Sequence, residues 1–466
     1  MTHTHVAGAI HADVSSPGPQ WLQRPVDANS LDPQLWSRTV SRDESGQLQV
    51  GGVAADALMA QHGSPLYVVD ESDLRSRARA FAEAFTGWDV YYAAKAFICR
   101  AVGRWVSEEG LGIDVCSLGE LTVALQAGID PARIGHHGNN KSVEELELAV
   151  TSRVGRIIVD SLQEISRLEE LCARHQVTAR VLVRVTAGVE AHTHEYIATA
   201  HEDQKFGFSI TNGQAMVAMV RCHVSPHLEL LGIHSHIGSQ IFATDGFEVA
   251  ARRTMKLLHQ FTDATGAELA ELDLGGGFGI RYTEADSPAT PDELAGNLRE
   301  IVEHEARAYQ MQVPRMSIEP GRAISGPSTL ALYTVGTIKP VDLDGGQQRL
   351  YVSVDGGMSD NIRPALYAAQ YSAVLANRVT DAPTVLSRVV GKHCESGDIL
   401  VHDVFLPNDI VPGDVIAIPA MGAYSRALAS NYNHATKPAV VSVRDGQVAT
   451  LLRRETLEDL LAFDVS

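Results

Sequence analysis

The sequence lacks long apolar segments and signs of export. No window of its 466 residues approaches the run of about 18 apolar residues that a membrane-spanning helix needs. The N-terminal stretch MTHTHVAGAIHADVSSPGPQ has neither the basic region nor the apolar core of a signal peptide. We therefore expect a cytoplasmic protein with no membrane partner.

Cysteine and basic residues are also scarce. The five cysteines are widely spaced and include no C-x-x-C pair, which argues against a disulfide framework and a thiolate zinc site. Lys and Arg number 38 against 57 Asp and Glu, giving a formal net charge of -19, whereas proteins that neutralise nucleic-acid phosphates normally carry the opposite sign. We expect no nucleic-acid partner. Hydrophobic residues at 45% and charged residues at 20% are typical of a globular enzyme and exclude a fibrous or disordered chain.

Short β-rich runs alternate with helical segments from about residue 66 onwards. The helix expected over 141–150 begins with a capping box formed by Ser142 and Glu145, and that over 162–175 has Leu and Ile at helical spacing. The expected strands are residues 89–95, 111–116, 133–137, 156–160, 179–185, 230–236, 271–275 and 315–319. Parallel strands need helical crossovers, so this alternation predicts an α/β fold of the (β/α)8 TIM-barrel type.

The last part of the chain has a different pattern. From about residue 330, β-rich runs are divided by Gly, Pro and Asp, and the pair Asp445-Gly446 is a strong hairpin signal. This pattern predicts a separate antiparallel β-barrel or sandwich. The expected organisation is a disordered tail (1–30), a segment packing on the β domain (31–62), the barrel (63–330) and the C-terminal β domain (331–466).

Polar residues and glycines follow several expected barrel strands, where barrel enzymes place their chemistry. They are Lys95, Asp114, Ser117, Asn139, Asn140, Lys141, His234, His236, the glycines of 275–279, and Glu319, Pro320, Gly321 and Arg322. A lone lysine after a strand is usually a solvated surface residue, but the apolar neighbours of Lys95 strengthen the alternative of a Schiff-base lysine, because an apolar pocket depresses the pKa of a lysine. The glycines match neither a P-loop nor a dinucleotide motif, but late in a barrel such a loop often binds phosphate.

His234 and His236 leave two interpretations open. Residues at i and i+2 on a strand face the same side, so the pair could ligate the metal of a hydrolase, with further candidate ligands after residue 186. A single histidine stacked on a cofactor, with its partner packed in the strand, explains the pair equally well. The loop candidates are His192, His194, His201, Glu202 and Asp203, and we interpret the histidines among them as part of a solvated lid.

Eight motifs occur together and in order: YYAAKAF at 91–97, GIDVCSLGE at 112–120, HGNNKS at 137–142, HSHIGSQ at 234–240, LDLGGGFG at 272–279, EPGR at 319–322, CESGD at 394–398 and GAYS at 422–425. From about residue 50 to 440, the chain resembles the diaminopimelate decarboxylases, a branch of the alanine-racemase-like, fold type III pyridoxal-phosphate enzymes. The resemblance implies a barrel with a trailing β domain. It also implies pyridoxal 5′-phosphate as cofactor and the decarboxylation of meso-2,6-diaminopimelate to L-lysine, the last step of lysine biosynthesis. A related ornithine, arginine or lysine decarboxylase is the alternative.

The resemblance assigns roles around the cofactor. Lys95 would hold it as a Schiff base, His236 would stack on the pyridine ring, and Glu319 would keep the ring nitrogen protonated so that the ring accepts electrons. Asp114 is expected to support His236 or the surroundings of Lys95. The other cofactor-binding residues implied are Ser239, Gly276, Gly277, Gly279, Pro320, Gly321, Arg322 and Tyr424.

The resemblance also assigns substrate contacts. Arg322 and Arg363 would bind carboxylate, for which arginine is suited, and Cys394 would be the proton donor. The remaining implied substrate contacts are Tyr367, Glu395 and Tyr424. The other cysteines are interpreted as small buried apolar residues; they are Cys99, Cys116, Cys172 and Cys222. In this family the loop carrying the cysteine reaches the partner's site, so a homodimer with shared active sites is implied.

Overall fold

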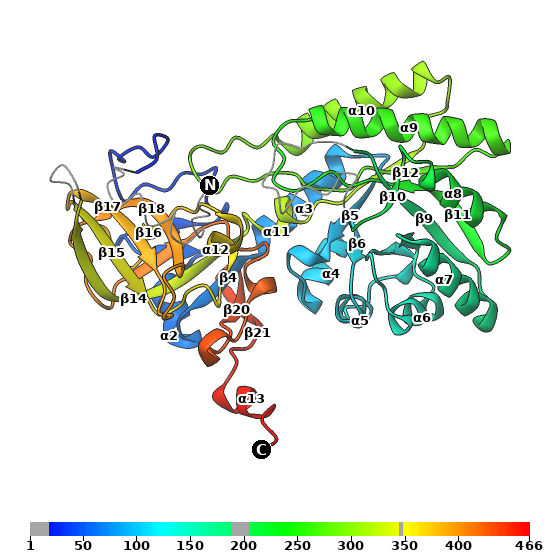
Figure 1. Ribbon diagram of the computed structural model, residues 1–466. Coiled ribbons are helices and arrows are strands. Elements are labelled where there is room, and N and C mark those ends of the chain that lie inside the picture. Colours follow the sequence, from blue (N-terminus) through cyan, green and yellow to red (C-terminus); the bar gives the residue numbers. More distant parts are fainter. Residues whose placement is uncertain (1–17, 189–204, 344–347) are drawn as a thin grey trace, which may run out of the picture. The chain divides into compact units, whose positions relative to one another are not determined.

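The computed structural model describes residues 18–188, 205–343 and 348–466, which form two compact units (Figure 1). The barrel unit contains Arg75–Gly279 and Pro288–Ile324, and the β unit contains the described residues up to Leu74 together with Ile280–Ser287 and Ser325–Ser466. Among the described residues, no helix is long and apolar enough to cross a membrane.

Eight parallel strands close into a barrel, which confirms the predicted fold class. Strand order runs from β9 through β11, β12, β13, β5, β6 and β7 to β8, and β8 pairs again with β9. The strands are β5 (Asp89–Ala93), β6 (Gly112–Val115), β7 (Ile134–His136), β8 (Arg156–Val159), β9 (Ala179–Thr186), β11 (Leu228–His234), β12 (Glu271–Asp273) and β13 (Arg315–Ile318). A short strand, β10 (Phe208–Ser209), adds to β9. All eight strands expected from the sequence are present.

Helices lie outside the barrel strands (Figure 1). They are α3 (Glu71–Ala84), α4 (Arg100–Glu108), α5 (Leu118–Gln126), α6 (Val143–Ser152), α7 (Leu162–His175), α8 (Gln214–Val224), α9 (Asp245–Thr265) and α10 (Pro291–Ala308). Helices α4 to α10 connect successive barrel strands, and α3 leads into the first of these strands. The capping box of Ser142 and Glu145 is present at the start of α6. Side-chain caps at Ser117 and Ser161 likewise begin α5 and α7 at the rim of the barrel.

The β unit is a mixed sheet, whereas the sequence predicted an antiparallel one. Its main strands are β4 (Leu66–Asp70), β14 (Thr329–Asp342), β15 (Gln348–Val354), β17 (Thr384–Val390), β18 (Ile399–Pro407), β19 (Val415–Ile418), β20 (Ala439–Arg444) and β21 (Gln447–Leu452). Most pairings are antiparallel, but β15 with β17 and β4 with β20 are parallel. The predicted hairpin joins β20 to β21, and Asp445 and Gly446 both have positive φ, as its tight turn requires.

Shorter elements complete the β unit. They are β1 (Ser41–Arg42), β2 (Leu48–Val50), β3 (Val53–Ala54), β16 (Val374–Leu375), α2 (Ala55–His62), α12 (Arg363–Tyr367) and α13 (Leu457–Leu461), while α11 (Arg322–Ser325) spans the boundary between the units. The predicted barrel range of 63–330 is too wide at its start. Strand β4 is fully buried between β14 and β20, so residues 66–70 belong to the β sheet.

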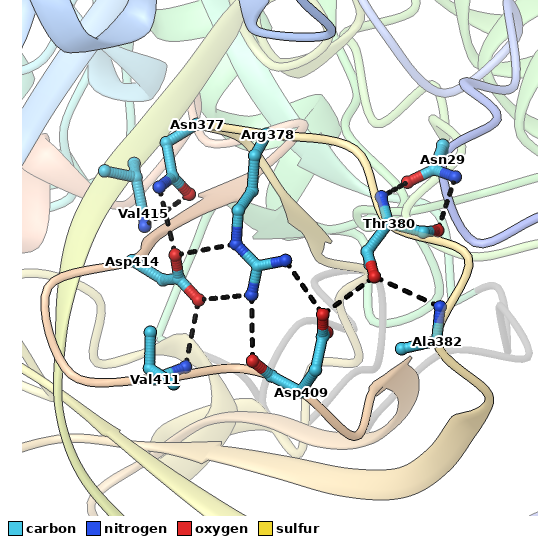
Figure 2. Close-up of polar contacts among 9 residues, drawn as sticks. All are labelled: Asn29, Asn377, Arg378, Thr380, Ala382, Asp409, Val411, Asp414 and Val415. Carbon is cyan, nitrogen blue, oxygen red and sulfur yellow. Dashed lines mark hydrogen bonds and ion pairs between the residues drawn. The ribbon is translucent and has the colours of Figure 1, made fainter.

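The N-terminal segment is attached to the β unit by apolar and polar contacts. Trp36 is buried in one hydrophobic cluster with side chains of β4, β14, β19 and β20. Figure 2 shows Asn29 exchanging two hydrogen bonds with Thr380, of 2.9 and 3.1 Å, beside Arg378, which pairs with Asp414. Residues 18–30 of the expected tail therefore make specific contacts, while 1–17 lie outside the described residues.

Candidate active site

A cavity of about 170 Å³ lies in the barrel unit at the carboxyl ends of its strands. The closed parallel barrel turns these strand ends toward one rim, so residues far apart in the sequence meet there. The polar side chains that line the cavity include Lys95, Asp114, His137, Arg184, His234, His236 and Glu319. The structure thus brings together five residues that the sequence singled out at strand ends, namely Lys95, Asp114, His234, His236 and Glu319.

Glu319 lies among three polar side chains and is only 7% exposed. Its Oε1 is 3.1 Å from Nε2 of His234 and 3.2 Å from Nε2 of His137. The same nitrogen of His137 lies 3.3 Å from Oδ1 of Asp114. Asp114 was expected to support His236 or the surroundings of Lys95. It lines the same cavity as Lys95, and its ion pair is with His137, because β6 and β7 are neighbours.

Burial and short charge separations set the ionisation of this group. Burial alone would lower the pKa of His137, but Glu319 and Asp114 outweigh it and raise that pKa to about 10. Burial would raise the pKa of Glu319, yet His137 and His234 hold it well below its usual range. Burial, and then the charge of Glu319, raise the pKa of Asp114 to about 7. At neutral pH, Glu319 is therefore an ionised carboxylate beside a protonated imidazole.

His236 faces the glycine turn that follows β12. Its Nδ1 accepts a hydrogen bond from the N–H of Gly276 at 3.2 Å, which fixes the orientation of the ring. Burial, together with the charge of Lys95, holds the pKa of His236 well below its usual value. This histidine is therefore a neutral ring, suited to stacking on an aromatic ligand.

The glycine turn allows three backbone segments to approach closely. A Cβ added to Gly276 would lie 2.1 Å from the carbonyl oxygen of Glu319, and one added to Gly277 would lie 2.3 Å from that of Gly238. Only glycine fits these positions. Gly279, which the resemblance placed at the phosphate, donates its N–H to the carbonyl of Ile241 at 2.9 Å.

The EPGR turn packs against the end of β5. A Cβ on Gly321 would lie 2.9 Å from the carbonyl oxygen of Ala93, and the carbonyl of Pro320 accepts the N–H of Ala93 at 3.3 Å. Arg322 is 7% exposed and donates from Nη2 to Oγ of Ser239 at 2.7 Å. Two residues expected at the cofactor thus contact each other directly.

The metal-site interpretation needed His234 and His236 to face one ion. In the structure His236 bonds to Gly276, whereas His234 lies with His137 and Glu319, their ligand atoms within 4.8 Å of one another. The two ion pairs to Glu319 already account for this spacing. His234 is also more than a packed strand residue, because it contacts the buried carboxylate. The further candidate ligands lie outside the described residues; they are His192, His194, His201, Glu202 and Asp203.

A second group of residues that the sequence singled out belongs to the β unit. Arg363, the first residue of α12, is 5% exposed. Its guanidinium stacks on Tyr282 at 4.6 Å and Tyr371 at 5.5 Å and donates to the hydroxyl of Tyr371. Within the described ranges no carboxylate pairs with Arg363. Tyr367 ends the same helix and is half-buried.

Cys394 and Glu395 are exposed in the loop between β17 and β18. Asp398 holds this loop: its carboxylate accepts the N–H of His393 at 2.8 Å and that of Met358 at 2.6 Å. The Met358 segment leads directly to Arg363. Tyr424 is half-buried and adopts a positive φ of 59°, a costly conformation that often occurs at functional sites.

Sequence reasoning missed several residues that line the cavity. His137 lay in a quoted motif but received no role, and Arg184, which stacks on Phe206 at 4.4 Å, was not named. The available signal was Arg184 itself, a charged residue near the carboxyl end of the expected strand ARVLVRV. Cys116 was interpreted as a buried apolar residue, but it is exposed and lines the cavity; Cys99, Cys172 and Cys222 are buried as expected.

Proteins similar in sequence and structure to this chain are pyridoxal-dependent decarboxylases. Residues 71–326 match the family model for the pyridoxal-binding domain of pyridoxal-dependent decarboxylases. A diaminopimelate decarboxylase from Mycobacterium tuberculosis is 53% identical over 440 residues, covering 93% of this chain and 98% of its own, and one from Bacillus subtilis is 46% identical over 431 residues, covering 92% and 97%. The crystal structure of the M. jannaschii diaminopimelate decarboxylase with L-lysine has a TM-score of 0.85 at 30% identity, covering 93% and 99%.

Barrel, cavity lysine and family match together define a pyridoxal-dependent decarboxylase. The near-complete coverage of the curated relatives narrows this class further. The chain belongs to the diaminopimelate decarboxylase family.

Proposed function

We propose that this protein uses pyridoxal 5′-phosphate to convert meso-2,6-diaminopimelate to L-lysine and carbon dioxide, the last step of lysine biosynthesis. The observation that carries the proposal is an ionised, buried Glu319 in the same cavity as Lys95. When bound, the cofactor supplies an electron sink for the pair released as the C–CO2 bond breaks.

The residues of the cavity suit this cofactor. Within the described residues, Oδ2 of Asp114 and Nδ1 of His234 are buried without a hydrogen-bond partner, as expected where a polar ligand completes the site. Lys95 would bind the aldehyde carbon, Glu319 would hold a proton on the ring nitrogen, and His236 would cover the ring. The phosphate would be bound by Ser239, Gly276, Gly277 and Tyr424, with Gly279, Pro320, Gly321 and Arg322 shaping the two turns.

Arg363 supports a substrate with a second carboxylate. A buried guanidinium without a carboxylate partner is costly, and an acidic ligand would offset that cost. Diaminopimelate has a carboxylate at the end that is not decarboxylated, whereas lysine and ornithine have none there. We assign the distal carboxylate to Arg363 and Arg322, the distal ammonium to Glu395, and a neighbouring contact to Tyr367.

The decisive test compares carbon dioxide release from diaminopimelate, lysine, ornithine and arginine. We expect turnover of diaminopimelate alone, and loss of turnover in Lys95→Ala. Arg363→Met should lower kcat/KM on the order of 100-fold, because removing one partner of a buried charge pair costs several kcal/mol, with unchanged cofactor affinity. Arg180→Met, at an exposed arginine paired with Glu229, is the control. Equal turnover of lysine or ornithine would contradict the substrate assignment.

We also propose a cytoplasmic homodimer in which Cys394 and Glu395 enter the partner's site, with Cys394 as the proton donor. Their exposure on a loop that Asp398 holds in place supports this role. Co-expressed Lys95→Ala and Cys394→Ala chains should regain partial activity, since a mixed dimer contains one intact site. Absence of activity in a verified mixed dimer would contradict shared sites, and cell fractionation tests the compartment.

A further inference from the structure

His137 has no role in the function proposed above, yet it lies at the centre of the buried charges. Its Nε2 contacts both carboxylates, Asp114 at 3.3 Å and Glu319 at 3.2 Å. The side chain is 12% exposed, and its ring meets that of His234 edge-on, with centroids 5.0 Å apart. This histidine therefore connects the ends of β6 and β13 across the barrel rim.

The backbone around His137 is fixed independently of its ring. Its N–H donates to the carbonyl of Val115 at 2.8 Å. The next residue, Gly138, has its carbonyl bound by the buried Lys141 at 2.8 Å, and Lys141 in turn pairs with Glu164 at 2.7 Å. The backbone that carries the imidazole is thus held in place by contacts within this chain.

We propose that His137 is a positioning residue of the cofactor site, which holds the Glu319 carboxylate through Oε1 and leaves Oε2 for the ring nitrogen. His137 and His234 both contact Oε1, while no hydrogen bond or ion pair within the described residues uses Oε2. The inference rests on the proposed cofactor. It assigns His137 no contact with cofactor or substrate.

Charges on the neighbouring strands favour this arrangement. Asp114 on β6 and Glu319 after β13 raise the pKa of His137 to about 10, against the effect of burial, so Nε2 carries a hydrogen that it can donate. His234 on β11 and Asp273 on β12 also act on this group, and the cavity contains Lys95. The net effect keeps Glu319 ionised, as an acceptor for a protonated ring nitrogen must be.

Two amide variants of His137 test whether a donor at the position of Nε2 is needed, or whether any polar side chain suffices. Glutamine extends its amide N–H about as far as Nε2 of histidine, whereas asparagine reaches only to the position of Nδ1. His137→Gln should therefore still hold Glu319, and His137→Asn should not. His175→Gln, at a half-exposed histidine 2.7 Å from Glu147, is the matched control.

The readouts are the affinity of the cofactor-free protein for pyridoxal phosphate and the 15N NMR shift of a labelled ring nitrogen across pH. His137→Asn should weaken binding by on the order of 10- to 100-fold, the cost typical of losing a group that orients a ligand, and should lower the pH at which the ring nitrogen loses its proton. His137→Gln should restore most of both properties. The control should match the wild type.

Equal behaviour of the Asn and Gln variants would overturn the inference, while failure of the wild type to bind the cofactor would instead overturn the proposed function. If His137→Asn does not fold, a measurement on the wild-type protein can still test the inference. In cofactor-free protein labelled with 15N-histidine, His137 should remain protonated at pH 8. A neutral His137 there would contradict the proposed clamp.

Discussion

Replacing Lys141 with methionine tests the buried ion pair beneath the active-site rim. Lys141 and Glu164 are each about 1% exposed at the side chain, and Nζ of Lys141 also donates to the carbonyls of Gly138 and Ile158, at 2.8 and 2.6 Å. Removing one member of a buried pair leaves an uncompensated charge, which costs about 3–5 kcal/mol. At roughly 2–4 °C per kcal/mol for a unit of this size, Tm should fall by roughly 6–20 °C.

The assay is thermal unfolding for Tm and chemical unfolding for the free energy of unfolding, both on the cofactor-free protein followed by circular dichroism at several pH values. Burial raises the pKa of Glu164 while Lys141 lowers it, so without the lysine this carboxyl should take up a proton more readily. The raised pKa makes the variant most stable at low pH, and that stability is lost as pH rises through the folded-state pKa. The deficit of Lys141→Met should therefore be smaller at pH 5 than at pH 8.

Two further variants complete this test. Lys141→Met combined with Glu164→Leu should recover part of the loss, because it removes the stranded charge, although the two carbonyls still lack a donor. Lys437→Met breaks a more exposed pair with Glu455, whose charged atoms are 3.5 Å apart, and should cost less than about 1 kcal/mol. A loss below about 1 kcal/mol for Lys141→Met, or no recovery in the double variant, would refute the reasoning.

Three other predictions concern the site. In the cofactor-free protein, the loss of unfolding free energy caused by His137→Gln should be greatest below pH 6.5. This loss should become smaller as pH rises toward about 10, because the folded-state pKa of His137 is raised. A loss that stays constant across this pH range would contradict the prediction. Gly135→Ala places a Cβ 2.4 Å from Oδ1 of Asp114 and should weaken cofactor binding measured by titration, whereas Gly119→Ala, whose nearest neighbour is 3.8 Å away, should not; equal affinities would count against the Asp114 contact. Asp398→Asn should lower kcat more than cofactor affinity, because Asp398 holds the Cys394 loop, and unchanged kinetics would show that the loop needs no such anchor.

Local patterns were enough to predict much of the fold. The eight barrel strands follow from alternating β-rich and helical runs, and the turn at Asp445-Gly446 follows from residues that tolerate positive φ. The assignment of β4 to a sheet could not be predicted in this way. LYVVD is a short apolar run that suits either unit, and only its pairing with β14 and β20 decides between them.

The same distinction holds within the site. Lys95, His236 and Glu319 could be identified because their motifs are local and occur in a fixed order. The role of His137 depends on Asp114 and Glu319, which reach it from other strands, so no spacing within its own motif could reveal it. Asp114 illustrates the same limit: its motif was identified, but its ion pair with His137 was not expected, because that contact depends on the adjacency of β6 and β7.

Further buried charged side chains lie below the cavity, and they explain how several acidic side chains can be buried close together in this unit. Arg156 stacks on Tyr91 at 4.4 Å and lies 3.6 Å from Asp273 and 3.3 Å from Glu271. Asp273 in turn accepts the N–H of Gly275 at 2.8 Å, so the guanidinium stabilises the carboxylate that anchors the glycine turn. A net charge of -19 therefore says little about this site. Because short-range ion pairs inside the barrel are screened far less than surface charge, local cations decide which carboxylates stay ionised.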